Sequence, residues 1–257
     1  MEIPKKLLTN MPFFNVQKVD KPVKALFKQI SDKDDRLLFA PLKLKHEELG
    51  DMYVSVHKHE RAWNRHELDI EDRSGYVLGK EIFSIDEGNK KMFGFDIFVD
   101  PYYRKKKLAE LLRLFSIMIM NENKSPHLKI YSKNSAVYFH SKYKFEPQIW
   151  QFMDRDKALE SIAENEAKEF IEMSRFAKNI QDRVRFFRED GAKQRELCEE
   201  TQELMQDYIN LAMQKQSPEK NYPLKWGMDM VLTKEKVESN KEFYNPLFER
   251  HGLDYRL

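Results

Sequence analysis

Four consecutive basic side chains give this sequence its clearest chemical signal. They are Arg104, Lys105, Lys106 and Lys107. They separate an apolar run with period-two alternation, which ends at Val99, from a second apolar run with helical spacing, which begins at Leu108. Because a helix N-terminus already has positive partial charge and unpaired N–H groups, cations there are unfavourable unless an anion neutralises them. The pattern therefore predicts a phosphate or diphosphate site at this turn, and the alternative is a solvated run of charge.

The two flanking elements must hold this turn in place. The residues before it predict a buried strand that is apolar on both faces, and Asp100-Pro101 ends it. The apolar positions of the strand are Phe93, Phe95, Ile97 and Val99. The residues after the turn predict a long helix with one apolar stripe. The stripe consists of Leu108, Leu111, Leu112, Phe115, Met118 and Ile119.

Two motifs with a familiar spacing occur at the turn and after it. Residues 104–109 follow the pattern Arg/Gln-x-x-Gly-x-Gly/Ala, in which Arg104 and Ala109 match and Lys107 replaces glycine. A second pattern ends with Lys144 in place of another glycine. Its matching residues are Asn134, Ala136, His140, Lys142 and Phe145. In both motifs the chain resembles the GNAT superfamily of acyl-CoA-dependent N-acyltransferases, over about residues 13–147 and most specifically over 92–147.

The resemblance implies a cofactor, a reaction and a set of binding residues. The cofactor would be acetyl-CoA or another acyl-CoA, and the acyl group would pass to a primary amine by direct attack. A backbone N–H near Phe98 or Val99 would hold the thioester oxygen, and the N–H groups of Lys105 to Ala109 would cradle the pyrophosphate. The cofactor-binding set is Phe98, Val99, Arg104, Lys105, Lys106, Lys107, Leu108, Ala109 and Asn134.

Lysine in place of the motif glycine is expected to alter cofactor contact without abolishing it. In the first turn of a helix φ is negative, so we expect Lys107 to be sterically allowed there. A pseudoenzyme that has lost the cofactor is the alternative.

Four residues are candidates for proton transfer. His140 stands where the family often has a tyrosine that protonates the departing thiolate, and imidazolium is an acid near neutral pH. Packing of His140 against the sheet is the alternative, and Tyr138 is a reserve candidate. Glu81 is the candidate general base. Because a buried carboxylate without a partner is costly, either Glu81 or Asp96 should have a catalytic role or an ion pair.

Several other functional classes are disfavoured. The polar residues His57, His59, His66, Glu67 and Asp69 are expected to form an exposed polar face and no metal site, because ligands two apart on a helix diverge. Cys198 lies in a charged helical segment, so a catalytic thiol is not expected. The basic turn is too short for nucleic acid, with only Tyr102 and Tyr103 as neighbouring aromatics. A dinucleotide fingerprint, a P-loop and a serine-hydrolase elbow are all absent from the sequence.

Composition and charge limit the classes of protein to which the chain can belong. The chain has 257 residues, of which 34% are charged and 41% hydrophobic, as in soluble globular proteins. Its net charge of +2 gives no general attraction to nucleic acid or membrane, so anion binding must come from a local cluster. One cysteine excludes internal disulfides, and the sequence has neither a signal-peptide core nor eighteen consecutive apolar residues. These features predict a cytoplasmic protein with no membrane contact.

The expected fold class is α/β (α+β), with a GNAT-like, mostly antiparallel mixed sheet flanked by helices. Before the basic turn we expect strands at 13–19, 62–70, 76–85 and 91–99, and helices from 20 and over 45–58. After the long helix we expect a strand at 127–132, a helix at 134–143 and a strand at 148–153.

Residues 155–217 differ in character, because two apolar stripes at helical spacing meet at Glu189-Asp190-Gly191. They predict an antiparallel helical hairpin. A strand at 226–232 should pair with that at 148–153, which gives a core of 1–154, a hairpin insertion of 155–217 and a returning strand and tail of 218–257. The alternative is that the hairpin begins an appended domain.

Two functions from different classes follow. The first is an N-acyltransferase whose amine acceptor is a small molecule or a protein. The second is a pseudoenzyme that binds a protein partner through the helical hairpin, with a degenerate cofactor pocket.

Overall fold

The computed structural model describes residues 14–15, 42–62, 64–86, 88–215, 222 and 224–257. It divides into two compact units. One contains residues 1–128 with 233–257, and the other contains 129–232. The expected helix from residue 20 lies outside the described residues, as does most of the expected strand at 13–19.

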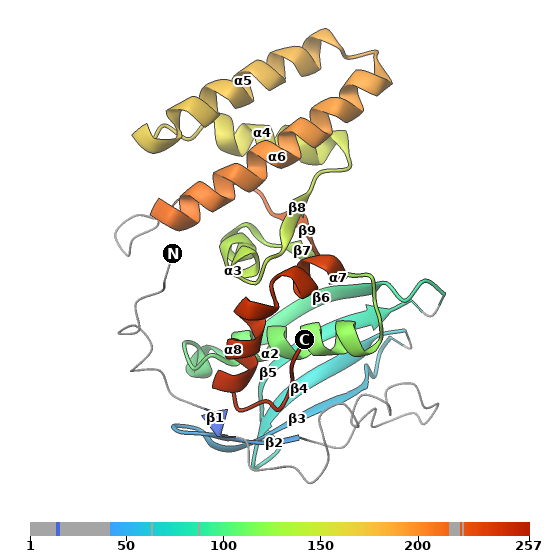
Figure 1. The fold of residues 1–257 in the computed structure, drawn as a ribbon, viewed down its shortest axis with the longest axis vertical. Coiled ribbons are helices and arrows are strands. Elements are labelled where there is room, and N and C mark those ends of the chain that lie inside the picture. Colours follow the sequence, from blue (N-terminus) through green and yellow to red (C-terminus); the bar gives the residue numbers. More distant parts are fainter. Residues whose placement is uncertain (1–13, 16–41, 63, 87, 216–221, 223) are drawn as a thin grey trace. The chain divides into compact units, whose positions relative to one another are not determined.

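The first unit contains an antiparallel sheet whose strands follow chain order (Figure 1). The strands are β1 (Phe14–Asn15), β2 (Leu42–His46), β3 (Gly50–Lys58), β4 (His66–Asp72), β5 (Val77–Ile85) and β6 (Met92–Val99). Each strand pairs with the next one along the chain. A short 3-10 helix (Pro101–Tyr103) and the basic turn then lead into α2 (Leu108–Glu122), which packs on β4, β5 and β6. The last two helices are α7 (Lys234–Ser239) and α8 (Lys241–Arg250).

The expected helix over 45–58 is wrong, because this segment is the hairpin of β2 and β3. The side chains of Met52, Val54 and Val56 are fully buried, and they alternate at period two. The positive φ of Gly50, 73°, lies at the start of β3 and suits a tight reversal. The helix was predicted because Leu49 and Tyr53, together with the buried strand residues Met52 and Val56, happen to lie at helical intervals.

The expectation that β6 is buried on both faces is also wrong. Of its residues only Met92 is buried, whereas Phe95 and Phe98 are 45% and 42% exposed. The register between β5 and β6 shifts after Ile82, so that Phe95 has no cross-strand partner. This bulge turns the residues after Phe95 over relative to those before it, which a strict period-two pattern does not allow for. Asp96, expected to be buried, is exposed for the same reason.

A close approach at Gly79 lets α2 lie against the sheet. A Cβ atom there would lie 3.2 Å from the carbonyl oxygen of Phe98 and 3.4 Å from the Leu112 side chain. The contact with the Phe98 carbonyl is tight and the contact with Leu112 leaves no spare room, so the missing side chain of Gly79 lets the end of β6 and α2 approach together. The position of the basic turn therefore depends on a glycine of the neighbouring strand.

The C-terminal segment holds α2 near both of its ends. Near the beginning, His251 Nε2 lies 2.8 Å from Glu110 Oε1, and both side chains are buried. Near the end, Asn121 donates a hydrogen bond to the Tyr255 hydroxyl, which donates to Glu122 at 3.0 Å. Side-chain hydrogen bonds therefore anchor the residues after α7 to α2, in the first unit.

The second unit combines strands and helices. Its strands are β7 (His127–Ser132), whose first two residues belong to the other unit, β8 (Glu146–Gln148) and β9 (Met228–Thr233), with β9 between the other two. Strands β8 and β9 pair antiparallel, as expected. The strand expected at 148–153 is wrong in its bounds, because β8 ends at Gln148 and a helix already begins at Phe152. A 3-10 turn (Asn134–Ala136) and α3 (Val137–Lys142) form the short helix expected after β7.

Between β8 and β9 the chain forms the helices α4 (Phe152–Ala163), α5 (Ile171–Phe186) and α6 (Gly191–Lys215) (Figure 1). The hairpin of α5 and α6 is present, and Asp190 caps α6 by accepting from the N–H groups of Ala192 and Lys193 at 3.0 Å each. The first stripe is not one helix, because residues 164–170 separate α4 from α5.

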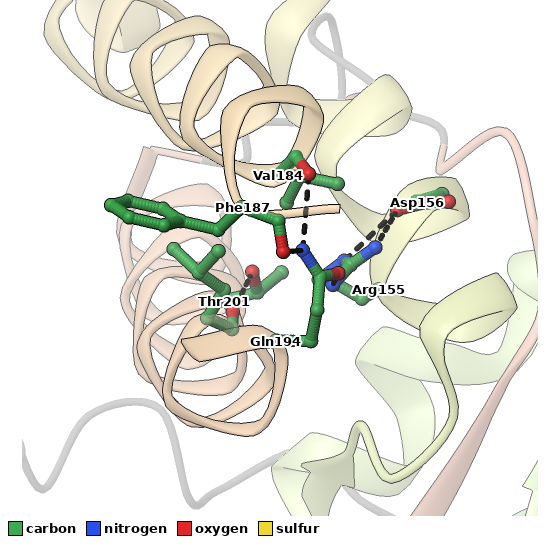
Figure 2. Close-up of polar contacts among 7 residues, drawn as sticks. Arg155, Asp156, Val184, Phe187, Gln194 and Thr201 are labelled. Carbon is green, nitrogen blue, oxygen red and sulfur yellow. Dashed lines mark hydrogen bonds and ion pairs between the residues drawn. The ribbon is translucent and has the colours of Figure 1, made fainter. Parts of the chain in front are cut away.

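A buried polar cluster joins the three helices (Figure 2). Arg155 of α4, 2% exposed, donates to Gln194 of α6, and Gln194 donates to the carbonyl oxygens of Val184 and Phe187 at 3.0 and 2.9 Å. These are carbonyls at the C-terminal end of α5, which a helix cannot satisfy internally. The cluster therefore fixes the angle at which the hairpin turns.

The molecule is a mixed α/β protein with a mostly antiparallel sheet and flanking helices, which confirms the predicted fold class. Among the described residues, every helix is too short or too polar to cross a membrane.

Candidate functional site

The basic turn begins at a well-anchored aspartate. Asp100 accepts a hydrogen bond from the N–H of Tyr102 at 2.9 Å, and its other carboxylate oxygen accepts from the Tyr76 hydroxyl. Its own N–H donates to the carbonyl of Leu78 at 3.0 Å. The start of the turn is therefore tied to β5 by backbone and to Tyr76, the residue before β5, by side chain.

Left-handed backbone marks the turn itself. Lys105 and Lys107 both have φ of 66°, and Lys107 is the N-cap of α2 rather than a residue of its first turn. The expectation of negative φ at Lys107 is therefore wrong. A left-handed lysine is disfavoured because its Cβ crowds the following carbonyl, which explains why a glycine suits this motif position. The backbone retains the conformation typical of glycine although the side chain has changed.

The second lysine that replaces a motif glycine behaves in the same way. Lys144 has φ of 66° and follows α3, where its N–H donates to the carbonyl of Ser141 at 2.9 Å. This is the left-handed helix end at which glycine is preferred.

We expect Lys144→Gly to stabilise the chain by about 1 kcal/mol, since the strain of a left-handed side chain is removed. Lys178→Gly is the matched control, because Lys178 is exposed in the middle of α5, where glycine should cost about 1 kcal/mol. Urea unfolding of both variants measures the two effects. Equal destabilisation of the two variants would contradict the strain at Lys144.

One of the four cations is engaged by the β2–β3 hairpin. Lys106 forms an ion pair with Glu48, and its carbonyl oxygen lies 3.3 Å from His46 Nε2. The other ring nitrogen of His46 accepts from the N–H groups of Glu48 and Leu49 at 3.0 and 3.1 Å, so Nε2 carries the proton. Burial lowers the pKa of His46, which favours this neutral form. Lys106 thus serves to hold the turn.

The other three cations have no ion pair with the described residues. Arg104 and Lys105 are exposed, and Lys107 is half-buried. Helix α2 begins without a side-chain cap, so the N–H groups of its first turn are not satisfied by a capping oxygen. Unsatisfied N–H groups at a helix N-terminus, with three cations beside them, are suited to a phosphate group.

Glu81 forms the ion pair that the sequence offered as the alternative to a catalytic role. Its carboxylate lies 3.2 Å from Arg113 Nη1 and accepts from the Ser116 hydroxyl, with both partners on α2. Glu81 and Arg113 are each 1% exposed. Burial raises the pKa of Glu81, and the Arg113 charge opposes that rise.

Three of the predicted residues, Asn134, Tyr138 and His140, lie in the second unit. Asn134 donates to the carbonyl of Leu224 at 3.0 Å and accepts from the N–H of Ser135 at 2.9 Å. His140 is 8% exposed and packs against the rings of Phe139 and Phe145. Asn134 and His140 thus belong to a different unit from the basic turn. The Tyr138 hydroxyl donates to the carbonyl of Tyr222, and burial raises the Tyr138 pKa.

A buried acid of the first unit was missed as a functional candidate. Asp69 of β4 is 4% exposed, and its Oδ2 lies 3.4 Å from His57 Nε2. Burial, together with the charges of Glu67 and Glu71, raises the pKa of Asp69 to about 7. The signal was present in the alternation of Glu67, Asp69 and Glu71 with Leu68 and Ile70, which gives β4 one acidic face. Among the described residues, no group of three or more histidine, cysteine or acidic side chains could hold a metal ion.

Comparison with known proteins gives a limited result. No protein-family model and no curated protein matches this sequence. Solved structures that share part of the fold include a GNAT-family acetyltransferase from Staphylococcus aureus Mu50, 21% identical, with a TM-score of 0.30, covering 33% of this chain and 54% of that one. An acetyltransferase from Trypanosoma brucei is 19% identical, with a TM-score of 0.31 and coverages of 34% and 66%.

A third structure is the PaiA N-acetyltransferase from Thermoplasma acidophilum in complex with coenzyme A. It is 19% identical, with a TM-score of 0.29, covering 34% of this chain and 55% of that one. The chain thus spans little more than half the length of two of these three proteins.

Proposed function

We propose that this chain is an acyl-CoA-dependent N-acyltransferase that passes an acyl group, with acetyl as the first candidate, to a primary amine. The observation that carries the proposal is the basic turn, where an uncapped helix N-terminus, two left-handed residues and three cations without a described ion pair converge. Such a site is unfavourable without an anion and favourable with one.

The residues of the turn suit the diphosphate of coenzyme A. The N–H groups of Leu108 and Ala109 would donate to phosphate oxygens, and Arg104 and Lys107 would supply charge. Lys105 would add a third cation, whereas Lys106 is held by Glu48. When bound, the acyl donor supplies a thioester that an amine can attack. Phe98 and Val99 at the end of β6 would lie along it, with the ring of Phe98 exposed for contact.

Removal of charge from the turn tests this assignment. We expect Arg104→Ala and Lys107→Ala each to weaken acetyl-CoA binding by roughly 10-fold or more, since a hydrogen bond to a charged group contributes about 1.5–3 kcal/mol. The loss should shrink as salt rises from 50 to 300 mM, because screening weakens the contact in the parent protein as well. Isothermal titration calorimetry measures the dissociation constants.

Lys91→Ala is the matched control, since Lys91 precedes β6 whereas the basic turn follows it. This variant should bind acetyl-CoA as the parent protein does. Equal affinity of all three variants would exclude the basic turn as the diphosphate site.

A second candidate function rests on the exposed apolar residues of α5. Phe176 is 45% exposed and Phe186 is 81% exposed, which is unusual for a solvent-facing helix and suits a protein partner. Acetyl-CoA separates the two functions. At 100 times its dissociation constant it should add about 2.7 kcal/mol of stability to a transferase, whereas the absence of any thermal shift would favour the binding protein.

A further inference from the structure

Asp69 belongs to a polar row that crosses the sheet. In the strand register Ser55 of β3 lies opposite Asp69, Asp69 opposite Lys80 of β5, and Lys80 opposite Phe98 of β6. Cross-strand partners share a face of the sheet, so these side chains lie on one face. The buried ion pair of Glu81 lies on the other face, against α2. Two strand spacings separate Asp69 from Phe98, which is roughly 10 Å.

The carboxylate of Asp69 is incompletely satisfied. Its Oδ2 lies near His57, but Oδ1 is buried and has no hydrogen-bond partner among the described residues. A buried acceptor without a donor is unfavourable, so the site is suited to a donor that arrives from outside the chain. The flanking side chains of His57 and Lys80 are 28% and 38% exposed, so a donor would reach Oδ1 by displacing one of these two partly exposed side chains.

The surroundings of Asp69 select the charge of that donor. Glu67 and Glu71 lie on the same face of β4, and Lys80, the nearest cation on β5, already contacts Glu67 at 2.6 Å. The face therefore retains negative charge, which favours a cation. A primary ammonium group has the matching charge and three N–H donors.

We infer that Asp69 binds the ammonium group of the acceptor and takes the proton that the group must lose before it attacks. This step rests on the proposed function. The ammonium gives one proton to Asp69, and its freed electron pair forms the C–N bond to the thioester carbon. The C–S bond breaks with its pair on sulfur, the nitrogen loses a second proton, and the thiolate gains one. Asp69 then releases its proton to solvent.

The protonation behaviour of Asp69 suits this task. A proton acceptor works best when its pKa lies near the working pH, and that of Asp69 is raised to about 7 by burial and by Glu67 and Glu71, against the opposing charge of Lys80. His57 on β3 also faces it, at 3.4 Å, and the register places Tyr53 of β3 and Asp96 of β6 on the same face of the sheet. An ammonium bound at Oδ1 favours the ionised carboxylate, so it should lower the midpoint of titration.

Carbon-13 NMR of aspartate-labelled protein tests the site without any turnover. We expect one carboxyl signal, absent in Asp69→Asn, to titrate near pH 7 and to move to lower pH with methylammonium chloride. Tetramethylammonium chloride at the same ionic strength has no N–H donor and should leave the midpoint unchanged. A midpoint that methylammonium leaves in place would overturn the inference.

Kinetics supply the second arm. With an amine that the chain acetylates, Asp69→Asn should lower kcat/KM by about 100-fold at neutral pH and remove its acid limb, as for loss of a general base. Glu71→Gln removes a neighbouring charge but keeps the Asp69 carboxylate, so the acid limb of kcat/KM should remain. Retention of the limb by Asp69→Asn would overturn the role of Asp69 while leaving the transferase intact. Failure of the parent protein to bind acetyl-CoA would instead refute the proposed function, and the NMR titration would then decide the ammonium site alone.

Discussion

Arg113→Met should destabilise the first unit by about 3–5 kcal/mol, the largest effect that we expect from one substitution. The reason is that Glu81 would remain buried without its counter-charge. Arg113 and Glu81 are each 1% exposed, and their side chains lie 3.2 Å apart. The Ser116 hydroxyl would still donate to the carboxylate, but one neutral donor cannot replace a charge. Urea unfolding, followed by a probe in the sheet, measures the loss.

Two controls separate pairing from packing. Glu81→Leu combined with Arg113→Met removes both charges, and it should recover most of the lost stability. Arg185→Ala removes one partner of the exposed Asp182–Arg185 pair, whose side chains are 77% and 79% exposed, and should change stability by less than about 1 kcal/mol. A double variant as unstable as Arg113→Met would show that shape, not charge, makes Arg113 necessary. If the double variant also retains acyl transfer, Glu81 is not the general base.

Asp69→Asn should increase stability at neutral and alkaline pH and leave it nearly unchanged near pH 4. In the folded chain the pKa of Asp69 is raised from 3.8 to about 7, so the folded state holds a proton that the unfolded state has released. The stabilising contribution of protonated Asp69 is complete below the unfolded pKa, and it is lost as pH rises through about 7. The difference corresponds to about 4 kcal/mol.

Asparagine has the shape of the protonated acid but cannot ionise, so the variant should lack this loss. Unfolding free energies of both proteins at pH 4.5, 6 and 8 give the comparison, in which titration of all other groups cancels. A constant difference between the two proteins across this range would contradict a raised pKa at Asp69.

The sequence indicated the turn and its helix well because each has a strong local pattern. Six apolar residues at helical spacing predicted α2, and Asp100-Pro101 correctly marked the end of β6. The same reasoning failed at residues 45–58, where Met52, Tyr53 and Val56 fit a helix and a strand equally well. Only pairing with β2 and β4 decides between them, and pairing is a long-range property.

The candidate site was likewise predicted only in part from the sequence. The cations of the turn were visible in the sequence, but their left-handed backbone was not, because lysine rarely adopts it. For Glu81 the sequence left two outcomes, a catalytic role or an ion pair. It did not identify Arg113 as the partner, because Arg113 lies 32 positions away. Asp69 was expected on an exposed polar face of a predicted strand, whereas His57 was expected on a helix, and the pairing of β3 with β4 is what places His57 beside Asp69.

The course of the chain through the two units has a consequence for biosynthesis. Residues 129–232 are translated before the segment that carries His251 and Tyr255, which holds α2 near both ends. On the ribosome the second unit can therefore fold while the first unit still lacks α7 and α8. A nascent chain arrested before residue 233 should expose α2 to proteases, and completion of the last 25 residues should close it.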